Sequence, residues 1–307
     1  MRSSLRRILL YSGASLLFTI LLYTRLGSEE KWQLFQLLSS CRADIPFQFR
    51  ILFPAVSNAL MWMIPFLDLR WSYYILTFFA TFLLLGVYRR YLGLFSSSVR
   101  STTPLLLLFP LAWNYVVVNP IFIPSDLVGV AFLTIGLYLI HERNWRYFYW
   151  IYPLAVLNRE TAIYLALAVL VTAPGRMRLR TALGHVLVQT VVWAGIKYLL
   201  FVSFDHLDGD MYIDTLAPNL DFLLQVVTFK GSSPLWLTIF GLVWLPGVIR
   251  WRSMPLFVRR LFLIVPPAFA VMLAAGEIWE TRIFTELSVI LATPTALLML
   301  RQDPGEG

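Results

Sequence analysis

Long apolar stretches recur along the whole chain and limit its fold more than any other feature. They approach the about 20 residues that a helix needs to cross a bilayer. The clearest examples are Ile8–Thr24, Tyr73–Tyr88 and Thr181–Phe204. Only 14% of the 307 residues are charged, whereas a soluble domain carries about a quarter. The sequence therefore predicts an all-α polytopic membrane protein.

The distribution of Lys and Arg predicts the orientation of the chain. Three arginines precede the first apolar stretch and no small-x-small cleavage site follows it, so we expect an uncleaved signal anchor with a cytoplasmic N-terminus. Further basic clusters follow alternate stretches, which gives about ten membrane segments with both termini cytoplasmic. The excess of 25 Lys and Arg over 17 Asp and Glu is thereby assigned to membrane topology and not to nucleic acid. We expect a single transmembrane domain over residues 1–307.

Two segments differ from simple spans and short turns. Residues 25–71 are long and interrupted, and we expect interfacial helices in a large first extracytoplasmic loop. Within them, residues 49–66 are apolar but contain Pro54 and Pro65; we favour an interfacial helix, and a span stays the alternative. Residues 205–230 hold five aspartates and are expected to form a solvated, acidic extracytoplasmic loop.

A polar sequence, Asn158-Arg159-Glu160-Thr161, separates two short apolar pieces. A single helix through this region would bury the polar side chains in hydrocarbon. We therefore predict two short helices that turn at Asn158. Broken helices at membrane depth usually line a cavity.

With this topology, isolated polar residues from four segments meet at the extracytoplasmic face. Ionisable groups at this depth cost several kcal/mol unless they are paired or hydrated, so each is a functional candidate. In chain order they are Asp44 and Arg50, then Asp126, then Asn158, Arg159 and Glu160, and finally Glu277, Glu280, Arg282 and Glu286. A carboxylate can take a proton from an acceptor hydroxyl, and arginines can bind phosphate oxygens with two parallel hydrogen bonds. The set predicts group transfer from a charged lipid.

The candidates nearest the N-terminus also have structural explanations. Asp44 precedes Ile-Pro in a loop, where Asp is often a turn or cap residue. Arg50 can extend to lipid headgroups. Asp126 follows Pro-Ser at a helix start, where Asp is a favoured residue.

The later candidates have structural alternatives as well. An ion pair of Arg159 with Glu160 or Glu280 can hold helices together. Glu280, Arg282 and Glu286 can pair along one helix start, and for Glu286 we favour a structural role.

This layout resembles the GT-C superfamily of membrane glycosyltransferases. Members have a cytoplasmic N-terminus, many spans, and a large first outer loop with interfacial helices and a catalytic acid, and they take sugars from polyprenyl-phosphate donors. The resemblance implies that Asp44 is the catalytic acid of that loop and general base of the transfer. The Asn-Arg-Glu-Thr and Glu-x-x-Glu-x-Arg stretches look like segments of small bacterial proteins of this kind, so a bacterial inner (plasma) membrane is implied. Residues implied to bind the substrate are Arg50, Asp126, Asn158, Arg159, Glu160, Glu280 and Arg282.

The sequence offers no certain cofactor. Its single cysteine, Cys41, and three scattered histidines predict no Cys or His metal cluster. The first loop lacks the pair of acids found in many GT-C members, with Asp44 alone, so a divalent metal stays an open alternative.

Two other classes of protein fit the same residues. A transporter or flippase for a lipid-linked sugar would use the same arginines and open to each side in turn, and broken helices suit it. The lack of repeat symmetry and of matching acids in the cytoplasmic loops favours the transferase. A non-catalytic membrane partner of a glycan-assembly enzyme is the third class. The sequence identifies neither the sugar nor the acceptor, which can be a glycan, a lipid or a protein.

Overall fold

The computed structural model describes residues 2–26, 29–43, 47–118, 122–204 and 215–301. Every regular element within these ranges is a helix, and five helices are long and apolar enough to cross a membrane. They are α1 (Arg2–Leu26), α4 (Leu69–Gly93), α6 (Pro124–Glu142), α9 (Leu179–Ser203) and the segment Leu256–Ala275, composed of α12 (Leu256–Leu261), η7 (Phe262–Ile264) and α13 (Val265–Ala275). The predicted helical membrane fold is confirmed at this level.

The remaining α-helices are shorter than the hydrocarbon layer is thick. They are α2 (Glu29–Ser39), α3 (Leu52–Met63), α5 (Leu108–Ala112), α7 (Trp145–Asn158), α8 (Tyr164–Thr172), α10 (Leu216–Val227), α11 (Leu245–Ile249) and α14 (Leu287–Arg301). Even the 15 residues of α14 rise only about 22 Å, against about 30 Å of hydrocarbon. The expected number of about ten membrane segments stays a prediction.

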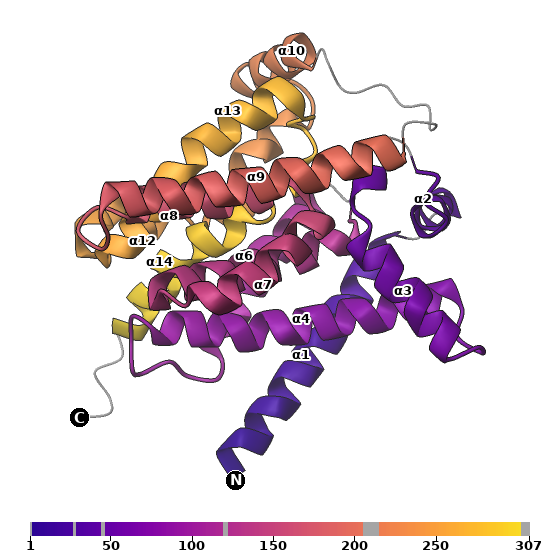
Figure 1. Cartoon of the computed structure of the whole chain (residues 1–307), viewed down its shortest axis with the longest axis horizontal. Coiled ribbons are helices and arrows are strands. Elements are labelled where there is room, and N and C mark those ends of the chain that lie inside the picture. Colours follow the sequence, from indigo (N-terminus) through magenta and orange to yellow (C-terminus); the bar gives the residue numbers. More distant parts are fainter. Residues whose placement is uncertain (1, 27–28, 44–46, 119–121, 205–214, 302–307) are drawn as a thin grey trace.

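The long helices lie side by side, with α6, α7 and α8 between α4 and α9 (Figure 1). α4 packs on α1 and α6, α6 on α7, and α7 and α8 on α9. The starts of α4 and α6 and the ends of α7, α9 and α13 therefore meet at one end of the molecule, which we call the site end. The opposite end holds the C-terminal end of α4, the start of α9 and α12.

Helix α14 is the core of the bundle. Its residues Leu287–Leu297 are all buried, and it contacts α4, α5, α6, α11 and α12. Thr293 Oγ1 lies 3.4 Å from the hydroxyl of the buried Tyr88 on α4. The short C-terminal helix is therefore surrounded by protein, which explains how it can be apolar without being long enough to span.

The predicted break between α7 and α8 is confirmed. α7 ends at Asn158, Arg159 has an extended backbone (φ −156°, ψ 149°), and the 3₁₀ turn η4 (Glu160–Ile163) follows. The Asn158 side chain donates to the Ser125 carbonyl, 2.9 Å away, which fixes the break against the start of α6.

Two segments differ from the sequence-based expectation. Residues 205–230, predicted as a solvated loop, contain helix α10, on which Asp221 lies; the other four aspartates of this stretch fall outside the described residues. The apolar stretch Leu235–Ile249, which was one of the about ten membrane segments expected from the sequence, is interrupted inside η5 (Ser233–Leu242), where Phe240 (φ 62°) and Gly241 (φ 58°) are left-handed. The amide of Phe240 donates to Asn114 Oδ1, 2.7 Å away, so a remote side chain replaces the helical partner.

Candidate functional site

Arg159 is the centre of a buried ion network at the site end. Its Nη1 lies 2.9 Å from Asp126 Oδ1 in the first turn of α6 and 3.1 Å from Glu286 Oε1 just before α14. Thr161 Oγ1 donates to the same Glu286 oxygen at 2.7 Å. Only 1% of the Arg159 side chain is exposed. The network therefore joins three segments that are far apart in the sequence.

Arg50 brings the first loop to this network. Its Nη2 lies 2.7 Å from Glu160 Oε1, and its Nη1 lies 3.9 Å from Asp126 Oδ1. The Glu160 carbonyl accepts a 2.8 Å hydrogen bond from Trp193 Nε1, and Lys197 Nζ lies 3.4 Å from the Phe49 carbonyl. Helix α9 thus closes the network on the side of the first loop.

Arg282 is the third guanidinium at this place. The Cζ atoms of Arg50 and Arg282 lie 5.3 and 5.2 Å from the centre of the Phe47 ring, within cation–π range. Arg282 Nη2 pairs with Glu280 Oε2. Although only 4% of the Arg282 side chain is exposed, its Nε and Nη1 have no hydrogen-bond partner among the described residues.

A cavity of about 70 Å³ lies among these groups. This volume is room for about two water molecules, which occupy about 30 Å³ each in the liquid. The charged residues that line it are Arg50, Arg159, Glu160, Glu277, Glu280 and Arg282. Burial and the neighbouring Glu280 carboxylate raise the pKa of Glu277, and Arg282 opposes them. In this state the cavity is a small, charged space with unpartnered donors, which suits an anionic group.

The structure brings together seven of the eight residues predicted for catalysis and substrate binding. Arg50, Arg159, Glu160, Glu280 and Arg282 line one cavity. Two others support it, because Asp126 pairs with Arg159 and Asn158 fixes the helix break beside it. The eighth, Asp44, lies outside the described residues, so its catalytic role stays a prediction.

The observed contacts of Arg159, Asp126 and Glu286 can be compared with the structural roles that the sequence suggested for them. Arg159 pairs with Asp126 and Glu286, and not with Glu160 or Glu280 as the alternative had it. Asp126 forms an ion pair with Arg159. It is not the N-cap of α6, because that position is Ile123, which makes no side-chain capping hydrogen bond. Glu286 joins α14 to η4, as suits the structural role that we favoured for it.

Sequence reasoning missed Phe47 and Thr161. Phe47 belongs to an aromatic loop in which no single ring has a distinguishing neighbour in the sequence. Thr161 completes the Asn-Arg-Glu-Thr stretch, and its hydroxyl next to two charged residues was the available signal.

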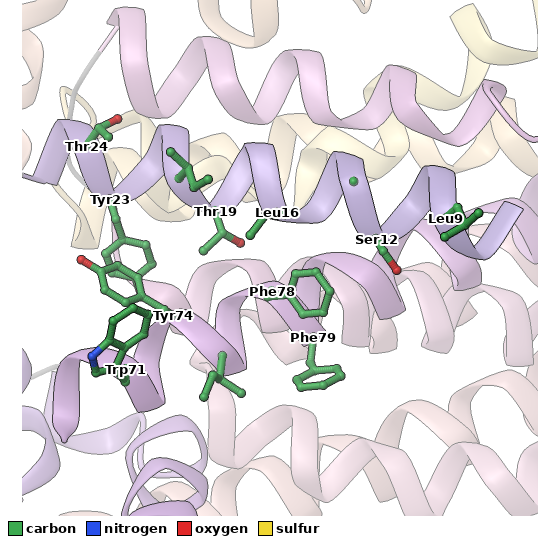
Figure 2. A pocket seen from close by; sticks show the side chains of 13 residues that line it. Leu9, Ser12, Leu16, Thr19, Tyr23, Thr24, Trp71, Tyr74, Phe78 and Phe79 are labelled. Atoms are coloured by element: carbon green, nitrogen blue, oxygen red, sulfur yellow. The ribbon is translucent and has the colours of Figure 1, made fainter. Parts of the chain in front are cut away.

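Two further hollows begin at or near this end of the molecule. A groove of about 850 Å³ between α1 and α4 is lined mainly by apolar side chains such as Leu16, Ile75 and Phe78, with Tyr23 and Trp71 at one end (Figure 2). A second groove, of about 400 Å³, is lined by polar and aromatic side chains that include Gln225, Lys230, Ser232, Trp236 and Trp279. The segment 276–282 contributes to both this groove and the cavity beside Arg282.

Within the described residues, no group of three or more His, Cys, Asp and Glu side chains is placed to hold a metal ion. No family model, curated protein or solved structure matches the chain. A functional assignment therefore depends on the sequence and on the geometry of these sites.

Proposed function

We propose that the chain is a membrane glycosyltransferase that moves a sugar from a polyprenyl-phosphate donor to an acceptor on the extracytoplasmic face. The observation that carries the proposal is Arg282, a buried guanidinium whose Nε and Nη1 atoms have no hydrogen-bond partner in the described part of the chain, at a cavity shared with Arg50. A planar guanidinium binds two oxygens of a phosphate in parallel through Nη2 and either Nε or Nη1, so a donor phosphate bound in this way replaces Glu280 at Nη2 of Arg282.

The three arginines have different roles in this proposal. Arg159 is already paired with two carboxylates, Asp126 and Glu286, and serves to position the surrounding segments. Among the described residues Arg282 pairs with one carboxylate, that of Glu280, whose side chain is 18% exposed. Arg282 therefore binds the donor phosphate. Arg50, whose guanidinium also lies within cation–π range of the Phe47 ring, adds positive charge.

The groove between α1 and α4 supports a lipid as substrate. Both of its walls are helices long enough to cross a membrane, and its side chains are mainly apolar (Figure 2). An apolar groove along membrane-spanning helices favours a hydrocarbon chain over a polar ligand.

The two hollows on the segment 276–282 favour transfer over transport. A transferase must bring together a donor and an acceptor, and this segment borders a charged cavity and a polar, tryptophan-containing groove. A flippase needs one binding site that opens to each side in turn. We assign the charged cavity to the donor phosphate and the polar groove to the sugar or the acceptor.

In the proposed reaction Asp44 is the general base. Its carboxylate takes the proton of an acceptor hydroxyl, and the hydroxyl oxygen attacks the anomeric carbon of the donor sugar. The bond between that carbon and the phosphate oxygen breaks, and polyprenyl phosphate leaves with the electron pair. Arg282 and Arg50 stabilise the negative charge on the leaving phosphate.

The proposed membrane placement follows from charge. The end opposite the site carries Arg89 and Arg90 near the C-terminal end of α4, Arg178 before α9, and Arg259 and Arg260 on α12. By the positive-inside rule this end is cytoplasmic. The proposal includes about ten membrane segments with both termini cytoplasmic, α2 and α3 as interfacial helices, and the inner membrane of a bacterium.

Binding and product formation by the purified protein in liposomes test this function. A radiolabelled polyprenyl-phosphate hexose is the probe, and Arg282→Gln, Arg282→Lys and the exposed control Arg146→Gln are compared with the wild type. Arg282→Gln should weaken donor binding about tenfold or more, since a hydrogen bond to a charged group contributes about 1.5–3 kcal/mol and tenfold corresponds to about 1.4 kcal/mol. Arg282→Lys should retain part of the affinity, because it keeps the charge and loses the planar fork.

The same liposomes separate the three classes of protein. A new glycosidic product that depends on the protein supports the transferase. Movement of the labelled lipid across the bilayer without such a product overturns it in favour of the flippase. Equal donor binding by the wild type and Arg282→Gln removes the cavity as the donor site, and a protein that neither forms product nor moves lipid is the non-catalytic partner.

A further inference from the structure

We infer that α10 lies in the membrane interface at the site end, with one face in the outer leaflet, and that its Asn219 fixes the turn carrying Glu277. The sequence predicted a solvated loop here, so this is a membrane-contact surface that the acidic composition concealed. The lipid contact does not depend on the proposed glycosyltransferase activity.

The protein-facing side of α10 is defined by Asn219, which is fully buried. Its Nδ2 donates to the carbonyls of Leu273 at 2.8 Å and Gly276 at 2.6 Å, and its Oδ1 accepts from the amide of Ile278 at 3.1 Å. One side chain thus satisfies three backbone groups at the C-terminal end of α13, where helical partners end. Val226, also buried, lies on the same side of the helix.

A second side of α10 is an exposed apolar ridge. Successive residues of an α-helix are about 100° apart, so positions 216, 220, 224 and 227 fall within an arc of about 80°. They are Leu216, Leu220, Leu224 and Val227, with exposed fractions of 46%, 52%, 59% and 72%. A row of large, exposed apolar side chains of this kind marks a surface that contacts a membrane or another protein.

The third side of α10 is polar, and the order of the three sides around the helix indicates that lipid covers the apolar ridge. Asp221, Gln225 and Thr228 lie about 40–100° beyond the far edge of the apolar ridge, on the side away from Asn219. Around the helix, the sequence of sides is therefore protein, apolar ridge and polar residues. A helix lying in a membrane interface beside its own protein has this order, since it contacts protein on one side, hydrocarbon below and water above.

The place of α10 in the fold agrees with this assignment. Thr215, just before the helix, donates from Oγ1 to the Ala274 carbonyl at 3.0 Å, and Ala275 is the last residue of the membrane-length segment Leu256–Ala275. The 12 residues of α10 rise only about 18 Å, too little to span. Figure 1 shows α10 beside the end of α13. The helix is thus at the level where that segment leaves the hydrocarbon.

The two sides together link the lipid surface to the candidate site. Gly276 and Ile278, both held by Asn219, flank Glu277, and the same turn continues to Glu280 and Arg282. Asn219 is therefore a positioning residue, and α10 holds the wall of the charged cavity at a fixed depth relative to the membrane.

Quenching of single fluorophores measures the lipid contact. Cys41, the one cysteine of the chain, is replaced by Ala, and a bimane-labelled cysteine is introduced by Leu220→Cys on the ridge or by Asp221→Cys on the polar side. In liposomes of phosphatidylcholine brominated on its acyl chains, the label at position 220 should be quenched at least threefold more than the label at position 221, and aqueous iodide should give the reverse order. Equal quenching of both labels by iodide, with none by the brominated lipid, overturns the interfacial assignment. The same result is expected if the ridge docks a second protein. The liposomes contain this chain alone, so such a ridge would be exposed to water and to iodide.

Hydrogen exchange measures the effect of Asn219 on the turn. The Ile278 amide donates to Asn219 Oδ1, so Asn219→Ala should accelerate its exchange about tenfold or more, while buried amides of α14 stay protected in a folded variant. The matched control is Asn58→Ala, which removes an exposed Asn whose Nδ2 donates to the Ser39 carbonyl. Unchanged exchange at Ile278 in Asn219→Ala overturns the positioning role. Neither measurement uses glycosyl transfer, so failure of the proposed function leaves both results interpretable.

Discussion

Thr161 and Glu286 are 125 positions apart in the chain, and a 2.7 Å hydrogen bond joins the Thr161 hydroxyl to Glu286 Oε1. The same carboxylate oxygen lies 3.1 Å from Arg159 Nη1. One oxygen at the start of the core helix α14 therefore fixes two neighbouring residues of the helix break. The network is a structural centre of the site end, and its integrity is a condition for any chemistry at the adjoining cavity.

Replacing Arg159 should destabilise the protein strongly. Arg159→Met removes the cation that the buried Asp126 and Glu286 share, and breaking a buried pair costs about 3–5 kcal/mol. Glu286→Gln should cost less, because the amide oxygen still accepts from Thr161 and Arg159. Thermal unfolding in detergent measures the effect, with the exposed Arg146→Met as control. An unfolding midpoint equal to that of the wild type would contradict the structural role.

Helix α6 should tolerate no side chain at Gly129. A Cβ atom there would lie 2.8 Å from Glu286 Oε1 and 3.2 Å from Arg159 Cδ. Gly129→Ala should therefore lower stability by about 1–3 kcal/mol, as overpacking does. The matched change Gly86→Ala, in α4, meets nothing within 4 Å and should raise stability by up to about 1 kcal/mol through helix propensity. Similar unfolding midpoints for the two variants would show that Gly129 is not a close contact.

Asp44→Asn should reduce turnover and leave donor binding intact. Asn has the shape of Asp without its basicity, and a general base contributes about 10²- to 10⁴-fold. The control is Asp68→Asn, because Asp68 caps α4 by accepting from the Trp71 amide at 2.8 Å and Asn caps equally well. Single-turnover transfer and equilibrium binding of labelled donor are the two measurements. Full turnover by Asp44→Asn would assign the base to another residue.

The contribution of Glu277 to stability should fall as pH rises. Its pKa is raised in the folded protein, so the folded state holds this proton more tightly than the unfolded chain. Stability from this group is present below the unfolded pKa and is lost as pH rises through the folded pKa. Glu277→Gln mimics the protonated side chain, and its unfolding midpoint should exceed that of the wild type more at pH 7 than near pH 4, below the ordinary Glu pKa of about 4.3.

The control for this pH series is Glu142→Gln, which removes one carboxylate at the opposite end of α6 from the site. A pH-independent difference between Glu277→Gln and the wild type would mean that Glu277 does not couple its proton to folding.

The two ends of α4 should lie on opposite sides of the membrane. In a Cys41→Ala background, cysteines replace the exposed Phe66 before α4 and the exposed Ser97 after it. An impermeant maleimide added to intact cells should label position 66 and reach position 97 only after permeabilisation, as the positive-inside rule requires. Labelling of both from outside would reverse the proposed topology of this helix.

The helix break was predictable from the sequence because it depends on the free energy of burying three polar side chains. Burying Asn158, Arg159 and Glu160 in hydrocarbon is unfavourable whatever surrounds them, so the break at Asn158 follows from these residues alone. The convergence of Arg50, Arg159 and Arg282 followed in the same way from topology.

The pairing of charges and the irregular segments were not predictable in this way. Whether Arg159 meets Glu280 or Glu286 depends on how α14 is placed against α6, and both acids lie in one short stretch. The kink at Phe240 requires the side chain of Asn114, which is 126 positions away. Helix α10 was concealed because the apolar ridge is sparse beside the aspartates that precede it.

The position of Glu286 also sets an order for biosynthesis. Asp126 leaves the ribosome before Arg159, but the second carboxylate of the network, Glu286, lies just before α14 and is translated well after Arg159. Until α14 has been made, Arg159 lacks one of its two carboxylate partners and the bundle lacks its central helix. The site end can therefore close only after α14 has been translated.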